Sequence, residues 1–203
     1  MMKIWLYFFA LIIYLGCTGQ TQPNTPSSQV QYTKKIDALF KDFNNKNSPG
    51  YAIVITKGNR VLYKKGYGMA NLEYDIPISP QSVFSIASVS KQFTGAAIAL
   101  LIMDGKLSLD DDASQYLPAL KKYPHKIQVK HLLYNTSGIQ DCYHLPRSSG
   151  KSWSTFNYFD IEEAIATSLK QDTLLFTPGK QWDYCNVNFM LLAKIVEKVS
   201  GKK

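Results

Sequence analysis

The feature that most constrains the fold is a long segment, residues 88–103, whose middle is apolar on nearly every side. Its central run reads TGAAIALL, and Gly105 follows its end. A helix of this composition has no polar face to turn toward water, so it is normally buried within a domain. A glycine just past the last apolar residue is typical of a helix C-terminus. The sequence therefore predicts a buried helix from Ser88 to Met103.

The other segments predict a helix, then a β-hairpin, then a helical block. Strand-forming runs at residues 51–56 and 61–65 flank the turn residues KGNR and predict the hairpin. Apolar residues at helical spacing predict helices at 32–43, 129–134, 161–169 and 188–199, the last of which should stop at Gly201. A two-stranded hairpin alone is a poor sheet, so the chain is expected to need further strands.

The N-terminus predicts export. Lys3 is followed by an apolar run, residues 4–15, which is too short to span a bilayer and is typical of a secretory signal. Residues 14–17 (YLGC) resemble a bacterial lipobox with Tyr14 in place of the usual Leu, which makes Cys17 the candidate lipidated residue. Ordinary signal cleavage nearby is the alternative. Either outcome places the protein in the bacterial cell envelope, in the periplasm or as a membrane-anchored lipoprotein.

The chain is expected to have three parts. Residues 1–17 are the predicted signal peptide, of lipoprotein type. Residues 18–30 are polar, contain prolines and predict a flexible linker. Residues 31–203 are expected to form the folded part.

Composition predicts a packed globule without nucleic acid as a partner. Hydrophobic residues make up 45% of the 203 residues, and the net charge is +8. Lys and Arg are scattered and form no arginine-rich arm, so a solvated basic surface is the favoured interpretation. The three histidines show no metal-ligand spacing, and we expect neither a metal nor a cofactor. The oligomeric state is left open.

The cysteines leave two possibilities open. If Cys17 carries lipid, Cys142 and Cys185 are free to pair in an oxidising compartment. Whether their Cα atoms come close enough cannot be read from sequence. Two unpaired, small apolar side chains are the default expectation.

The first candidate for chemistry is an S-x-x-K pattern. It occurs three times, at Ser88, Ser148 and Ser200, and only Ser88 opens a strongly apolar helix. Residues three apart share one helix face, so the Lys91 amine can reach the Ser88 hydroxyl. Desolvation beside such a helix favours a neutral lysine, which can act as a base toward a serine nucleophile. The alternative is a helix-capping serine with a solvated lysine.

The second candidate is Tyr184-Cys185-Asn186. Residues two apart in an extended segment point the same way, so Tyr184 and Asn186 can face one cleft. A phenol near a cationic lysine ionises more easily and can carry a proton, while a carboxamide can hold a substrate amide. The alternative is a buried tyrosine beside a turn asparagine.

Several segments, in order, resemble the class C β-lactamase-related serine hydrolases, which include β-lactamases, D-Ala-D-Ala carboxypeptidases and esterases. FSIASVSKQFT at residues 84–94 looks like the family's nucleophile segment. LLYNTSGI at 132–139 is similar to its LLxHTSGI segment with Asn135 in place of His, and FTPGKQWDYCN at 176–186 to its FxPGxxWxYSN segment. Linked segments in the right order are far more specific than any one motif.

The resemblance implies an α/β fold of the serine β-lactamase type, in which an N-terminal helix and a β-hairpin of an antiparallel sheet accompany a helical domain. It also implies Ser88, Lys91 and Tyr184 as catalytic residues and Asn186 as a substrate-binding residue. The family's third motif, K-T-G or H-x-G on a later strand, does not occur in these 203 residues. We therefore expect residues 31–203 to be the N-terminal part of such a domain, C-terminally truncated, with the later strands missing.

The expected function is that of an exported serine hydrolase that forms an acyl-enzyme with a small-molecule or peptide substrate. A β-lactam, a D-Ala-D-Ala peptide and an ester are all compatible with the motifs. The alternative, motivated by the missing third motif, is a catalytically incomplete, envelope-tethered protein that binds ligand or is inactive. A lipid on Cys17 would add the membrane as a partner.

Overall fold

The computed structural model describes residues 26–147, 150 and 160–202, which fall into two compact units divided between Phe84 and Ser85. The predicted signal peptide with Cys17 and the first part of the predicted linker, residues 18–25, lie outside the described residues. Each unit has its own helices or strands.

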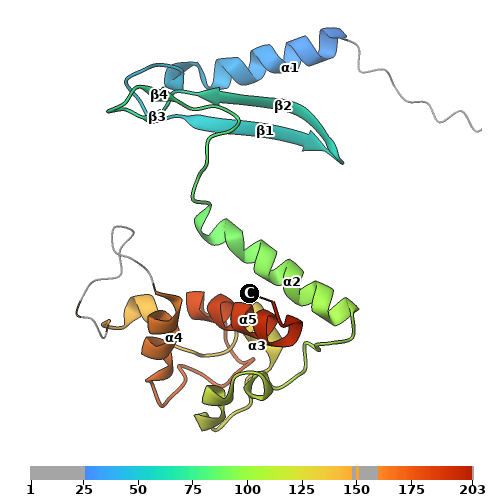
Figure 1. Ribbon diagram of the computed structural model, residues 1–203, viewed down its shortest axis with the longest axis vertical. Helices are drawn as coiled ribbons and strands as arrows, with labels where there is room; N and C mark the ends of the chain where they lie inside the picture. Colours follow the sequence, from blue (N-terminus) through green and yellow to red (C-terminus); the bar gives the residue numbers. More distant parts are fainter. Residues whose placement is uncertain (1–25, 148–149, 151–159, 203) are drawn as a thin grey trace, which may run out of the picture. The chain divides into compact units, whose positions relative to one another are not determined.

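The first unit contains helix α1 (Pro26–Leu39), the short 3-10 helix η1 (Lys41–Phe43) and two small sheets (Figure 1). The larger sheet pairs β1 (Tyr51–Lys57) with β2 (Arg60–Tyr67) in antiparallel register, which confirms the predicted hairpin. The smaller sheet pairs β3 (Met69–Asn71) with β4 (Ile76–Pro77).

Helix α1 begins before the predicted end of the linker. It begins at Pro26, so residues 26–30 are helical although the linker was expected to extend to residue 30. The physical reason is that proline is well tolerated in the first helical turn, where its missing N–H would have no helical partner anyway.

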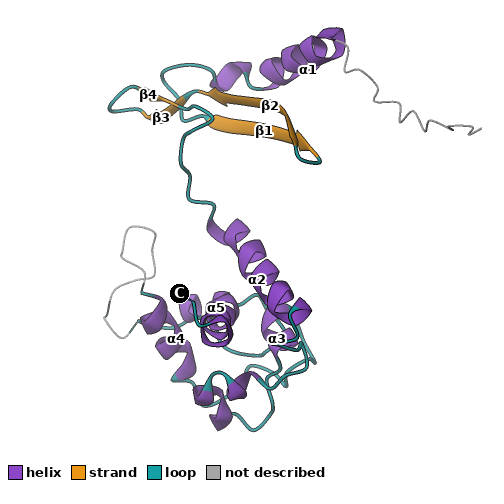
Figure 2. Ribbon diagram, turned by 45° about the vertical axis from the view of Figure 1, so that its right-hand side comes forward, coloured by secondary structure: helices purple, strands orange, loops and turns teal. Residues whose placement is uncertain are grey.

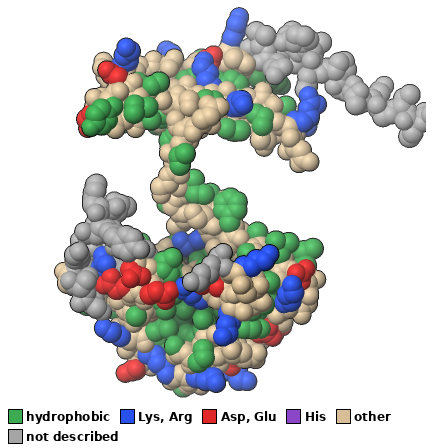
Figure 3. Space-filling view, in the orientation of Figure 1, with side chains coloured by type: hydrophobic (Ala, Val, Ile, Leu, Met, Phe, Trp, Pro, Cys, Tyr) green, Lys and Arg blue, Asp and Glu red, His purple; other side chains and the backbone are tan. Residues whose placement is uncertain are grey.

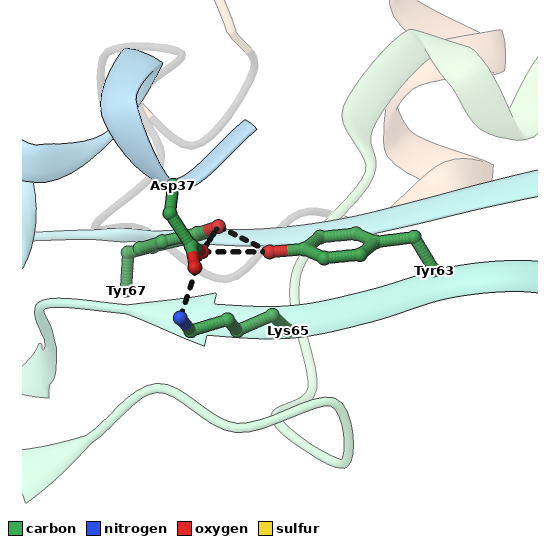
Figure 4. A network of polar contacts seen from close by, with 4 residues as sticks. All are labelled: Asp37, Tyr63, Lys65 and Tyr67. Carbon is green, nitrogen blue, oxygen red and sulfur yellow. Dashed lines mark hydrogen bonds and ion pairs between the residues drawn. The ribbon is translucent and has the colours of Figure 1, made fainter. Parts of the chain in front are cut away.

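A cluster of polar side chains joins α1 to β2 (Figure 4). One carboxylate oxygen of Asp37 accepts hydrogen bonds from Lys65 Nζ at 2.7 Å, from the Tyr67 hydroxyl at 2.7 Å and from the Tyr63 hydroxyl at 3.0 Å. Residues 63, 65 and 67 share one face of the strand because side chains alternate along it. The hydrogen bonds from Lys65 and Tyr67 lower the pKa of Asp37 from 3.8 to about 2.

The second unit is helical, and its elements surround α5 (Asn186–Ser200) (Figures 1 and 2). Helices α2 (Lys91–Met103), α3 (Val129–Leu133) and α4 (Ile161–Leu169) all contact α5. Short 3-10 helices complete the unit: η2 (Ala87–Ser90), η3 (Ala113–Gln115), η4 (Pro118–Lys122) and η5 (Cys142–His144). The buried core comes from these elements and includes Ile98, Leu132, Leu191, Leu192 and Ile195.

The predicted helices are largely confirmed. Helix α4 has the expected bounds, α3 ends one residue early, and α5 starts two residues earlier than predicted. Helix α5 stops at Gly201, which adopts the left-handed conformation (φ 68°) that favours glycine at helix ends.

The central helix differs from its prediction in two ways. Its first turn, Ala87–Ser90, is a 3-10 helix, and α2 proper begins at Lys91. One face is buried at Ile98 and Leu101, whereas Phe93, Leu100 and Met103 are 64%, 62% and 81% exposed. The reason is that α2 packs on α5 by one face, and no described element of its own unit covers the other.

The basic residues are scattered over the surface, as the sequence predicted. Figure 3 shows Lys and Arg side chains dispersed over the visible face of each unit. In the part of the chain that the structure describes, no helix has the length and apolar character needed to cross a membrane.

We predict that Asp37→Asn loosens α1 from the hairpin. The carboxylate accepts three hydrogen bonds, one from a charged donor, and such bonds are stronger than neutral ones. Hydrogen–deuterium exchange should become faster in α1 and β2 at neutral pH. Asp42→Asn, which removes the same charge at an exposed site on η1, should leave that exchange as in the wild type.

The difference between wild type and Asp37→Asn should depend on pH. Because the folded-state pKa of Asp37 is below its ordinary value, its stabilising effect is fully present above pH 3.8 and is lost as pH falls through about 2. Exchange rates of the two proteins should therefore converge in strong acid, and a difference that persists there would contradict the prediction.

Candidate active site

The candidate site lies in the second unit, where the chain turns into α2. Ala87 has a φ of 44°, in the left-handed region that residues with a side chain rarely adopt. Strain of this kind is often found at functional sites. Neither η2 nor α2 receives a side-chain cap, so Ser88 is not the capping serine of the alternative interpretation.

The Ser88 hydroxyl instead contacts two of the side chains predicted to act with it. The Tyr184 hydroxyl lies 2.8 Å from Ser88 Oγ, and Lys91 Nζ donates to Ser88 Oγ at 3.1 Å. Lys91 comes from the first turn of α2, whereas Tyr184 lies two residues before the start of α5. The contact of α2 with α5 is therefore what brings together residues 96 positions apart.

Asn186 completes the cluster. Its side-chain oxygen accepts a hydrogen bond from Lys91 Nζ at 2.8 Å. The ammonium group also lies 5.0 Å from the centre of the Tyr184 ring, a cation–π distance. All four site residues predicted from sequence, Ser88, Lys91, Tyr184 and Asn186, are thus within one connected set of contacts.

The environment of Tyr184 favours ionisation of its phenol. Partial burial alone raises the pKa, but the interactions with Lys91 and Ser88 outweigh it and hold the pKa of Tyr184 below its ordinary value of 10.0. The side chain is 38% exposed, so it is not the buried tyrosine of the alternative interpretation. A phenol of this kind can accept and return a proton beside a nucleophilic hydroxyl.

Asn135 holds the segment that carries Tyr184 and Asn186. Its backbone oxygen accepts from Asp183 N at 3.0 Å, and its side-chain oxygen accepts from Cys185 N at 3.3 Å and from Asn188 Nδ2 at 3.1 Å. Asn135 has a φ of 55°, and asparagine is among the few residues that adopt this conformation readily. We did not predict from the sequence that Asn135 holds this segment. The signal that could have indicated it is that Asn135 stands where the family's segment has His.

Two further residues fix this region and were also missed. Ser137 is buried and donates to Asn188 Oδ1 at 2.7 Å, so the chain before η5 is tied directly to α5. Asp141, also buried, accepts hydrogen bonds from both nitrogens of Asn186. The available signal was that Asp141 is the only acidic residue between Asp112 and Asp160.

The remaining sequence candidates are the two cysteines and the two further S-x-x-K patterns. Cys142 and Cys185 are both buried and unpaired, as the default expectation held. Ser148 and Lys151 lie outside the described residues, and Ser200 bonds locally to the backbone of Lys202. No group of three or more His, Cys, Asp or Glu side chains among the described residues is placed to hold a metal ion.

The chain matches the sequence model of the family described as Beta-lactamase over residues 36–203. It is 32% identical over 172 residues to Protein flp of Staphylococcus aureus, strain MRSA252, a match that covers 82% of this chain and 33% of that protein.

Two solved structures are similar in fold. The octameric penicillin-binding protein homologue from Pyrococcus abyssi has a TM-score of 0.65 and 30% identity, over 87% of this chain and 40% of that one. EstCE1, a hydrolase with promiscuous acyltransferase activity, has a TM-score of 0.65 and 26% identity, over 87% of this chain and 47% of that one. The chain therefore spans about a third of its curated relative and under half of each similar structure, and it has part of the serine β-lactamase-like fold that was predicted.

We predict that Asn135→Ala destabilises the second unit by about 3–4 kcal/mol. Two side-chain hydrogen bonds are lost at about 1 kcal/mol each, and alanine costs about 1–2 kcal/mol in the left-handed conformation. Asn135→Gly, which avoids the backbone cost, should lie between this variant and the wild type. Urea unfolding followed by circular dichroism measures the free energies of unfolding. Equal stability of all three proteins would contradict the role given to Asn135.

Proposed function

Since the chain belongs to the beta-lactamase family, we propose that it is a serine hydrolase that forms an acyl-enzyme on Ser88. The observation that carries the proposal is the position of Ser88 Oγ, within hydrogen-bond distance of both Lys91 Nζ and the Tyr184 hydroxyl. A nucleophile and its base held at such distances are the geometric signature of covalent catalysis.

In the first step the Ser88 oxygen attacks the substrate carbonyl carbon and its proton passes to the Tyr184 oxygen. The positive charge of Lys91, which contacts both groups, stabilises the phenolate that accepts the proton. Collapse of the tetrahedral intermediate breaks the bond to the leaving group, and the leaving group takes up the proton that Tyr184 received from Ser88. Water then attacks the acyl-serine and releases the acid. The Lys91 amine is the alternative proton acceptor.

The substrate class is an amide or an ester, and the candidates remain a β-lactam, a D-Ala-D-Ala peptide and a simple ester. The similar proteins include a penicillin-binding protein homologue and a hydrolase with promiscuous acyltransferase activity, and these descriptions support acyl transfer as the shared chemistry. We further propose that residues 1–17 direct export to the bacterial cell envelope, with Cys17 as the lipid attachment site.

We predict that a fluorophosphonate or a labelled penicillin modifies Ser88. Peptide mapping by mass spectrometry should place the adduct on this residue, and Ser88→Ala should lose it. Ser90→Ala is the matched control, because Ser90 lies in the same 3-10 turn and is also exposed, and it should be labelled as the wild type is. A folded protein that binds the penicillin but gives no adduct would contradict the enzyme and support a ligand-binding role.

The pH dependence of labelling should reveal Tyr184. Because its pKa is below 10.0, the rate of Ser88 acylation should rise with pH through a limb that lies below pH 10. Tyr184→Phe should remove that limb and slow acylation by about 10²–10⁴-fold, the usual value of general base catalysis. A limb that survives in Tyr184→Phe would assign the base to Lys91 instead.

A further inference from the structure

Asp141 is a buried carboxylate that belongs to neither the S-x-x-K nor the Y-x-N motif. It is 3% exposed and lies directly before η5. One of its oxygens accepts from Asn186 N at 2.5 Å and from Asn186 Nδ2 at 2.8 Å, and the other accepts from Tyr143 N at 3.0 Å. It therefore contacts a residue of the candidate site through two bonds and its own helix through one.

The bond to Asn186 Nδ2 decides which way the amide faces. A carboxamide has a donor end and an acceptor end, and an ionised carboxylate only accepts. Asp141 therefore takes the NH₂ end and leaves the oxygen, which accepts from Lys91 Nζ at 2.8 Å. A reversed amide would set its oxygen against the carboxylate and its NH₂ against the ammonium, two repulsive pairs.

The amide thus lies between an anion and a cation. Hydrogen bonds to charged groups are roughly twice as strong as neutral ones, and bonds in series polarise one another. The result is a fixed line of contacts from Asp141 through Asn186 to Lys91, and from Lys91 to Ser88 Oγ at 3.1 Å.

We propose that Asp141 is a positioning residue of the acylation step, which orients the Asn186 amide so that its oxygen holds the Lys91 amine beside the Ser88 hydroxyl. This inference rests on the proposed function, because it assigns Asp141 a role in a reaction of Ser88. In the part of the chain that the structure describes, Asp141 has no hydrogen bond to Ser88 or Lys91, and it acts through Asn186.

The chain offers a matched control for a merely structural role. Asp112 caps the 3-10 helix η3 as Asp141 caps η5, and it accepts from the N–H two residues ahead at the same distance, 3.0 Å. Asp112 lies directly before η3, and its side chain accepts from Ser114 N, whereas that of Asp141 also accepts from Asn186. The variants Asp141→Asn and Asp112→Asn thus make the same change at two capping positions, only one of which touches the site.

The experiment measures the modification of Ser88 by a fluorophosphonate, in which the Ser88 oxygen attacks phosphorus, fluoride leaves and a phosphonyl ester forms. The rate is measured over a range of concentrations, so that the maximal rate and the half-saturating concentration are separated. Asp141→Asn should lower the maximal rate by about 10- to 100-fold, because small misplacements of reacting groups cost rate in that range. The half-saturating concentration should change little, and Asp112→Asn should match the wild type in both quantities. Equal rates in Asp141→Asn and wild type, or equal losses in the two variants, would overturn the proposal.

A double-mutant cycle tests whether Asp141 acts through Asn186. In an Asn186→Ala background there is no side-chain amide left to orient, so adding Asp141→Asn should slow the modification of Ser88 no further. Independent losses that multiply in the double variant would overturn the proposed route. Should Asp141→Asn fail to fold, Asp141→Glu, with Asp112→Glu as its control, applies the same comparison while it retains the charge.

A measurement without chemistry separates this inference from the proposed function. In ¹⁵N-labelled wild-type protein, the Asn186 side-chain amide, assigned with Asn186→Ala, should show one proton shifted downfield by its bond to the carboxylate. That shift should disappear in Asp141→Asn and persist in Asp112→Asn. Its absence from the wild type would overturn the orientation, whereas its presence in a protein that no probe acylates would reject the hydrolase and leave the orientation standing.

Discussion

The candidate site depends on how residues 135–141 hold the start of α5. Asn135 fastens Asp183, Cys185 and Asn188, while Ser137 bonds Asn188 and Asp141 bonds Asn186. These contacts involve buried or partly buried polar groups, each of which would be costly to leave unpaired. Because Tyr184 lies within the segment so held, its hydroxyl is kept at hydrogen-bond distance from Ser88 Oγ.

The two units are held together by different kinds of contact. In the first, a two-stranded hairpin, which is only marginally stable by itself, is held by two sets of contacts. Asp37 of α1 accepts hydrogen bonds from three donors on one face of β2, and the ring of Phe40, directly after α1, packs against Tyr51 and Tyr67. In the second, apolar residues of α2, α3 and α4 pack against α5. Lys91 and Asn186 of the site belong to the first turns of α2 and α5, and side chains on helices are held more accurately than side chains on loops.

Much of this could be predicted from sequence, because the relevant signals are local. The hairpin follows from two strand-forming runs around a turn, and the end of α5 follows from Gly201. The pairing of Ser88 with Lys91 follows from helical spacing, although Ser88 lies in the 3-10 turn that precedes α2. The exposure of Phe93 and Leu100 could not be predicted, since an apolar helix carries no information about which of its faces other elements cover.

The residues that sequence reasoning missed share a physical reason. Asn135, Ser137 and Asp141 act through partners about 45 to 53 positions away, so neither spacing nor propensity gives them meaning. A buried acid in a stretch otherwise free of acidic residues nevertheless needs a set of donors, and a carboxamide at the start of a helix offers both a backbone and a side-chain N–H. In this chain the two N–H groups of Asn186 are donors to the buried carboxylate of Asp141. That pairing leaves only the amide oxygen free to turn toward Lys91, so a requirement of burial also sets the geometry around the nucleophile.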